Sequence, residues 1–132
     1  MSNYKIISCL ALLTALGIYL TACTKTSTLL IDNSPEVTTT VSFGTDIIPI
    51  LSTSCAKSGC HNGSISPNLT AANAYTSLVN GNFLEVGNPS NSLVYLWLTG
   101  KESSTMPLGA SNNPSNINGL MLAWVKQGAK NN

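Results

Sequence analysis

The most chemically distinctive stretch of the sequence is a pair of cysteines with a histidine directly after the second. Four residues separate Cys55 from Cys60, and His61 follows at once. In the usual haem attachment sequence, Cys-x-x-Cys-His, two thiols add across the porphyrin vinyl groups and the adjacent imidazole coordinates the iron. The spacing here is two residues longer. Residues 57–59 can bulge outward without moving the histidine, because Gly59 tolerates a positive φ.

Two other interpretations of these residues stay open. In an exported protein, two otherwise unpaired cysteines most often form a disulfide, which would leave His61 as a surface residue. A zinc site would need four ligands, whereas the chain has one His and only Cys55 and Cys60 remain after processing. The sequence therefore favours one covalently bound haem c, with a haem-free protein containing a Cys55–Cys60 disulfide as the alternative.

A second axial ligand for the iron has to come from a methionine. His61 is the only histidine, so two imidazoles cannot bind the same iron. Met121 lies between two leucines in a predicted helix, where a flexible apolar side chain fills a core. Met106 lies in a polar loop, and Pro107 biases it towards an extended conformation. We therefore expect His61 and Met106 to be the axial ligands of the iron.

The N-terminus has the features of a bacterial lipoprotein signal peptide. Lys5 precedes an apolar run over residues 6–20, which is shorter than the run of about 20 that a transmembrane helix needs. The sequence Leu-Thr-Ala-Cys over residues 20–23 has the form of a lipobox. We therefore expect residues 1–22 to be removed and Cys23 to be lipidated, which attaches the protein to a membrane by acyl chains.

The remaining chain divides into a tether and one domain. Residues 23–42 comprise the lipidated cysteine and a Thr- and Ser-rich stretch, whose composition predicts a flexible tether. Residues 43–132 form the expected folded domain. After processing, five lysines balance five acidic residues and no arginine is present. This balance argues against a nucleic-acid partner and gives no obvious electrostatic field for docking.

The spacing of apolar residues predicts an all-α domain of about four short helices. The first leads from Thr45 or Asp46, its expected N-cap, to Cys55, with Pro49 in its first turn. The others cover residues 69–79, with Tyr75, Leu78 and Val79 inward; 92–98, capped by Ser90 or Asn91 and closed by Gly100; and 116–127, capped by Ser115. No alternating strand pattern is present. Because so small a domain with long loops buries little apolar surface, we expect something besides its own apolar side chains to complete the core.

These features resemble a class I c-type cytochrome of the small single-haem kind. The likeness extends from Phe43 to the C-terminus. It comprises the helix Asp46-Ile47-Ile48-Pro49-Ile50-Leu51 before the first haem cysteine, Cys60-His61-Asn62-Gly63, Met106-Pro107, and the final helix Trp124-Val125-Lys126-Gln127-Gly128-Ala129. The order and spacing of these segments together are specific to the family.

The resemblance implies an arrangement of the core. The first and last helices would cross at nearly right angles beside the haem, with Phe43 or Ile47 against Trp124. Leu69, Tyr75 and Trp97 would line the haem pocket.

An iron with two axial ligands has no open coordination site, which favours electron transfer over catalysis. A methionine ligand and a dry pocket both raise the reduction potential. We expect a monomeric, non-enzymatic electron carrier on the outer membrane, facing the periplasm and serving redox proteins there or in the membrane. The alternatives are a five-coordinate haem enzyme or gas sensor, and a haem-free binding lipoprotein.

Overall fold

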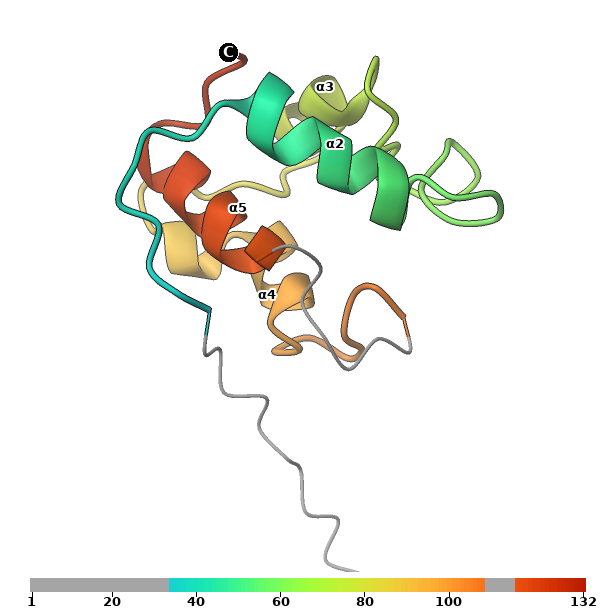
Figure 1. Cartoon of the computed structure of the whole chain (residues 1–132). Coiled ribbons are helices and arrows are strands. Elements are labelled where there is room, and N and C mark those ends of the chain that lie inside the picture. The colour runs from blue at the N-terminus through green and yellow to red at the C-terminus, as the bar shows by residue number, and fades with distance from the viewer. Residues whose placement is uncertain (1–33, 109–115) are drawn as a thin grey trace, which may run out of the picture.

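The computed structural model describes residues 34–108 and 116–132. Within these residues the chain forms helices and no β-strand, which agrees with the all-α class expected from the sequence. The elements are η1 (Phe43–Ile47), α2 (Ile48–Ile50), η2 (Leu51–Cys55), α3 (Ala74–Asn80), η3 (Pro89–Asn91), α4 (Leu93–Leu98) and α5 (Ile117–Lys126). Figure 1 shows η1, α2 and η2 as one continuous helix, with α5 between it and α4.

The N-cap of this first helix is Ser42, not Thr45 or Asp46 as expected. The Ser42 hydroxyl accepts a hydrogen bond from the Thr45 amide at 3.2 Å. In return, the Asp46 carboxylate accepts one from the Ser42 amide at 2.7 Å. Two amides at the helix start are thus satisfied reciprocally, in the manner of a capping box.

Pro49 lies in the middle of the helix rather than in its first turn, so that expectation was wrong. Proline has no amide hydrogen, and its ring crowds the carbonyl of the residue four positions earlier. Just before Pro49 the helix is widened to π geometry, and the Ile48 amide donates to the Phe43 carbonyl five residues back. The wider turn gives the ring room, so the helix continues to Cys55.

The second helix, α3, begins at Ala74 and not at residue 69 as expected. The Asn68 side-chain oxygen accepts hydrogen bonds from the amide and the hydroxyl of Thr70, at 3.1 and 2.7 Å. These local bonds hold the chain in a turn and compete with helix formation. Ala74 and Leu78 form the buried face of α3, whereas Val79, which was expected to point inward, is 41% exposed.

Ser92 is the N-cap of α4, one or two residues later than expected, and Gly100 follows the helix with a φ of +68°. The Ser92 side chain is buried and accepts a hydrogen bond from the Glu85 amide at 2.9 Å, so it anchors the preceding loop. The predicted cap of the last helix, Ser115, lies outside the described residues; Asn116 is the N-cap there.

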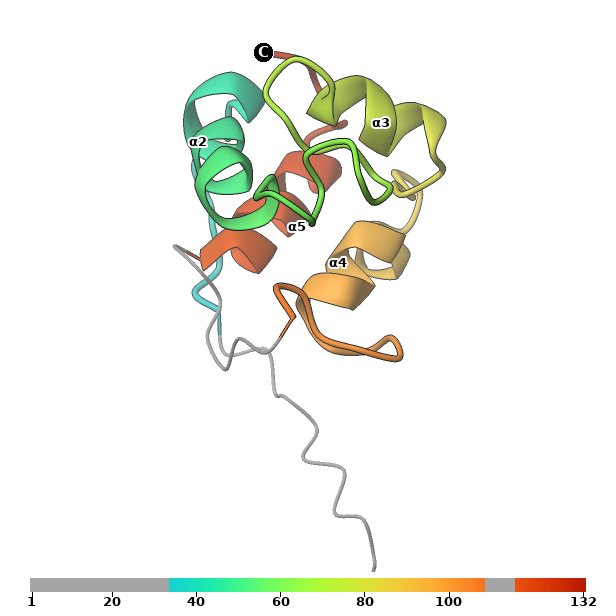
Figure 2. The ribbon, with the colours of Figure 1, turned by 90° about the vertical axis from the view of Figure 1, so that its right-hand side faces the viewer.

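The core forms where the first helix, α3 and α5 meet. The rings of Phe43 and Trp124 lie 4.7 Å apart, which confirms the contact expected between the first and last helices. Tyr75 from α3 packs edge-on against Phe43, with ring centroids 5.6 Å apart. Met121 is fully buried in α5, as the sequence predicted for a core methionine. Figure 2 shows α5 in the centre of this arrangement.

Residues 34–42 differ from the flexible tether expected there, because they pack on the domain. Val41 is 3% exposed, and Val37 packs against the same core. The last residue, Asn132, also closes on the first helix: its carbonyl oxygen accepts from the Gly44 amide at 2.8 Å, and its side-chain oxygen accepts from the Phe43 amide at 3.0 Å. The folded unit therefore starts before Phe43.

No helix in the described residues has the length and apolarity to cross a membrane.

Replacing Ser42 by alanine is expected to destabilise the domain by about 1 kcal/mol, because the first helix loses its cap. Urea unfolding followed by circular dichroism would measure the change. Ser52→Ala is the matched control, since Ser52 is exposed on the same helix. Equal unfolding midpoints for the two variants would contradict the role of Ser42.

Candidate functional site

The two cysteines lie at either end of a short outward bulge after the first helix. Cys55 is the last residue of η2, and the Ala56 amide closes that helix on the Leu51 carbonyl. The Cys60 amide then donates to the Lys57 carbonyl at 2.9 Å, which forms a tight turn. Gly59 in this turn has a φ of +76°, the conformation that the expected bulge needs.

Backbone hydrogen bonds bring His61 back towards the first helix. The His61 amide donates to the Cys55 carbonyl at 3.2 Å, and the His61 carbonyl accepts from the Leu69 amide at 2.7 Å. His61 is thus fixed between the end of the first helix and the segment around Leu69 that leads to α3. The structure in this way brings Cys55, His61 and Leu69 together.

The imidazole of His61 is oriented by one hydrogen bond. Its Nδ1 lies 3.0 Å from the carbonyl oxygen of Pro67. A carbonyl oxygen can only accept, so Nδ1 carries the proton, and the neutral ring then has its unshared electron pair on Nε2. Histidines that bind metals typically donate their other ring N–H to such an acceptor, which fixes the tautomer and the ring orientation.

The two thiols are in different surroundings and are not joined as a disulfide. Cys55 is half-buried, whereas Cys60 is exposed. Burial raises the pKa of the Cys55 thiol above its ordinary value; the positive charge of Lys57 opposes this shift, and Cys60 adds a small further rise. Cys55 therefore stays protonated to a higher pH than a free cysteine does.

In haem-free protein, iodoacetamide is expected to alkylate Cys60 well before Cys55, because the thiolate is the reacting form and Cys55 is both shielded and harder to ionise. The rate at Cys55 should rise only at a more alkaline pH. Folding favours the neutral form of the Cys55 thiol, so Cys55 contributes to the stability of the fold at a pH below the pKa of an unfolded cysteine. This contribution should be lost as the pH rises through the raised pKa of Cys55 in the folded protein.

Mass spectrometry of a Cys9→Ser, Cys23→Ser chain over a pH series would measure the two rates. Urea should make them equal. Faster alkylation of Cys55 in the folded protein would contradict the structure.

Met106 is attached through its backbone to α4. Its amide donates to the Trp97 carbonyl at 3.1 Å, and both side chains are half-buried. The loop over residues 101–108 and the loop over residues 56–68 lie on the same side of the domain, which is the right-hand side in Figure 1 and faces the viewer in Figure 2. The sequence-predicted ligands His61 and Met106 thus come from loops on one face.

The three predicted pocket residues differ in burial. Leu69 is 7% exposed and belongs to the core, and Tyr75 packs on Phe43 and Trp124. Trp97 is only half-buried. It belongs to α4, whose six residues are all apolar or aromatic, yet only Tyr95 among them is buried.

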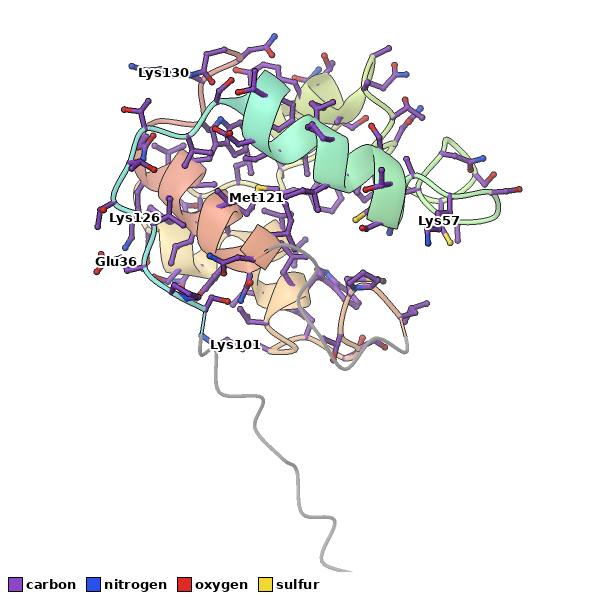
Figure 3. All side chains as sticks on the ribbon, in the orientation of Figure 1. Glu36, Lys57, Lys101, Met121, Lys126 and Lys130 are labelled. Carbon is purple, nitrogen blue, oxygen red and sulfur yellow. The ribbon has the colours of Figure 1, made fainter. Side chains whose placement is uncertain are left out.

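The loops over residues 56–68 and 101–108 carry three charged side chains, Lys57, Lys101 and Glu102. Lys57 is exposed at the bulge, far from the buried Met121 (Figure 3). The Lys101 ammonium lies 5.5 Å above the ring of Tyr95. Among residues 34–108 and 116–132, no three His, Cys, Asp or Glu side chains are grouped so as to hold a metal ion. Cys23, the predicted lipidation site, lies outside the described residues.

Two residues of the site were missed by the sequence analysis. The Pro67 carbonyl orients His61, and Asn68 holds the next turn through Thr70. A backbone acceptor has no signature in a sequence. The Asn-x-Thr spacing at residues 68–70 is a recognisable local turn signal, and it could have placed the start of α3 correctly.

Comparison of the chain with sequence profiles of known protein families, with characterised proteins and with solved structures finds no match.

Proposed function

We propose that this chain is a lipid-anchored c-type cytochrome that transfers single electrons through one covalently attached haem. The observation that carries the proposal is the hydrogen bond from His61 Nδ1 to the Pro67 carbonyl. It holds the imidazole directly after Cys60 in the tautomer that a metal ligand needs. A surface histidine beside a disulfide has no need of such an orientation.

The donor set fits covalent haem attachment. Each free thiol would add its S–H bond across one vinyl group, so that an S–C bond forms and the proton goes to the neighbouring carbon without net oxidation. Cys55 and His61 are held by a direct backbone hydrogen bond. The exposed turn over residues 57–60 leaves Cys60 accessible. The bulge therefore allows the longer spacing between the cysteines.

The partly buried apolar side chains of α4 also fit a large flat cofactor. Five of the six side chains of α4 are incompletely buried, and Met106 is half-buried beside this helix. A porphyrin has two broad apolar faces that would cover such side chains and contribute the burial that a small domain lacks. The thioether of Met106 is then the available second ligand for the iron.

Haem c supplies one-electron exchange between ferrous and ferric iron when bound. The Nε2 of His61 and the thioether of Met106 are the groups that would hold the haem iron. Two protein ligands would exclude small molecules from the iron, and apolar surroundings would favour its ferrous state. These roles support an electron carrier of the cell envelope, with its domain in the periplasm and its partners among redox proteins there or in the membrane.

The proposal is tested by expressing the full chain in a bacterium that attaches haem to exported proteins. After acid extraction of free haem, the mass should equal that of the processed protein plus one haem, and a denaturing gel should stain for haem. A mass equal to the protein with a Cys55–Cys60 disulfide would overturn it.

A further inference from the structure

Residues 34–42 form a clasp along the full length of α5. Near the C-terminal end of this helix, the Gln127 side chain holds two backbone groups: its amide nitrogen donates to the Thr39 carbonyl at 3.0 Å, and its oxygen accepts from the Val41 amide at 2.9 Å. At the other end, the Asn116 side chain donates to the Pro35 carbonyl at 3.4 Å. The clasp is therefore antiparallel to α5 and attached at both ends.

The clasp determines where the chain enters the domain. Its first described residues lie at the lower end of the molecule in Figures 1 and 2, at the N-terminal end of α5. The loop over residues 101–108, with Met106, lies at this same end. Lys130 (Figure 3) and the C-terminus (Figures 1 and 2) lie at the opposite end.

The length of chain between this point and Cys23 is short. Ten residues, 24–33, separate Cys23 from Ser34. Whatever their conformation, they span at most about 40 Å, and a flexible chain of this length covers about 20 Å on average. A domain of this size is about 30 Å across. The end at which the chain enters is therefore held closer to an anchor at Cys23 than the opposite end is.

We propose that the clasp makes the domain present its 101–108 end to the bilayer, so that the surface around Met106 faces the lipid headgroups. This inference rests on the lipidation of Cys23 in the proposed function. The side chains at this end suit a headgroup region, since Leu108 is 71% exposed and Lys101 is also exposed. A redox partner reached through this end would then be one embedded in the same membrane.

The orientation is tested by photo-crosslinking the full lipidated chain in phosphatidylcholine–phosphatidylglycerol vesicles. Benzoylphenylalanine replaces either Ser104, which is exposed in the 101–108 loop, or Lys130, which is exposed at the opposite end. Mass spectrometry then measures the fraction of protein that carries a crosslinked phospholipid. The clasp predicts several-fold more lipid adducts from position 104 than from position 130. Equal yields, or a higher yield from position 130, would overturn the proposal.

Two variants test whether the clasp sets the orientation, rather than the short length of chain after Cys23 alone. Gln127→Ala removes both hydrogen bonds at the C-terminal end of α5 and should bring the two yields closer together. Lys126→Ala is the matched control, because the neighbouring exposed side chain is not part of the clasp. If Gln127→Ala leaves the ratio of yields unchanged, the clasp does not set the orientation.

The same samples separate this inference from the proposed function. Their haem content is measured independently from the pyridine haemochrome spectrum. A higher adduct yield from position 104 in a protein without haem would support the orientation and contradict the cytochrome. Equal adduct yields in a protein that carries haem would support the cytochrome and contradict the orientation. A chain that carries no acyl chains by intact mass, and that gives no lipid adducts at either position, would overturn the orientation because its anchor is absent.

Discussion

Replacing both Cys55 and Cys60 by serine is expected to abolish all haem staining on denaturing gels, because no thioether can then form. Each single variant should retain one thioether and some stain. The structure predicts that Cys60→Ser and Cys55→Ser differ in the amount of haem stain that they retain, because Cys60 is exposed and Cys55 is half-buried at the helix end. Haem staining and intact mass together measure the number of attached cofactors.

The control for this experiment is Cys23→Ser, which should lose its acyl chains while its haem stain remains. A retained stain would show that haem attachment does not need the lipid. Staining that persists in the double variant would contradict attachment through these thiols. An unstained wild-type chain with a Cys55–Cys60 disulfide would instead favour the haem-free lipoprotein.

Met106→Ala should remove the methionine-to-ferric-iron charge-transfer band in the near infrared and lower the reduction potential. A methionine ligand favours ferrous iron, and axial ligation changes haem potentials over a range of about 0.8 V. We expect a decrease on the order of 0.1 V, which is a small part of that range. Optical titration of the purified protein with redox mediators would measure it.

Met121→Leu is the matched control, because Met121 is fully buried in α5 among core residues. This variant should keep the band and the potential, and a similar volume should limit any loss of stability to less than about 1.5 kcal/mol. If the wild-type protein has a high-spin spectrum without the band, Met106 does not bind iron. The five-coordinate enzyme or sensor would then be favoured.

The helical class could be predicted because apolar residues recur at helical spacing in the first helix and in α5, although η3 has no such pattern. The contact of Phe43 with Trp124 was also predictable, as both residues lie on the apolar faces of their helices. The residues at which the helices begin were harder to predict. Ser42 caps the first helix three residues before the expected start, and the helix passes Pro49 by widening to π geometry just before it, a fit of the proline ring that depends on three dimensions.

The site was predictable to the extent that it depends on side-chain type. The residue types and order of Cys55, Cys60 and His61 made them the candidate site, and the bulge at Gly59 followed from its tolerance of a positive φ. The orientation of the imidazole was not predictable, because it depends on the Pro67 carbonyl. Every residue has a backbone carbonyl, so only the conformation of the chain decides which one the imidazole meets. Likewise, the packing of residues 34–42 depends on Gln127, far away in sequence.

The closure of the first helix by Asn132 has a consequence for the order in which the protein matures. The carbonyl and side chain of Asn132 accept hydrogen bonds from the amides of Gly44 and Phe43. If the chain is exported from its N-terminus, as the proposed function requires, the segment from Cys55 to His61 would cross the membrane before Asn132 does. These two hydrogen bonds at the start of the first helix would then form only after the cysteines have emerged, so haem attachment could begin before the fold is complete.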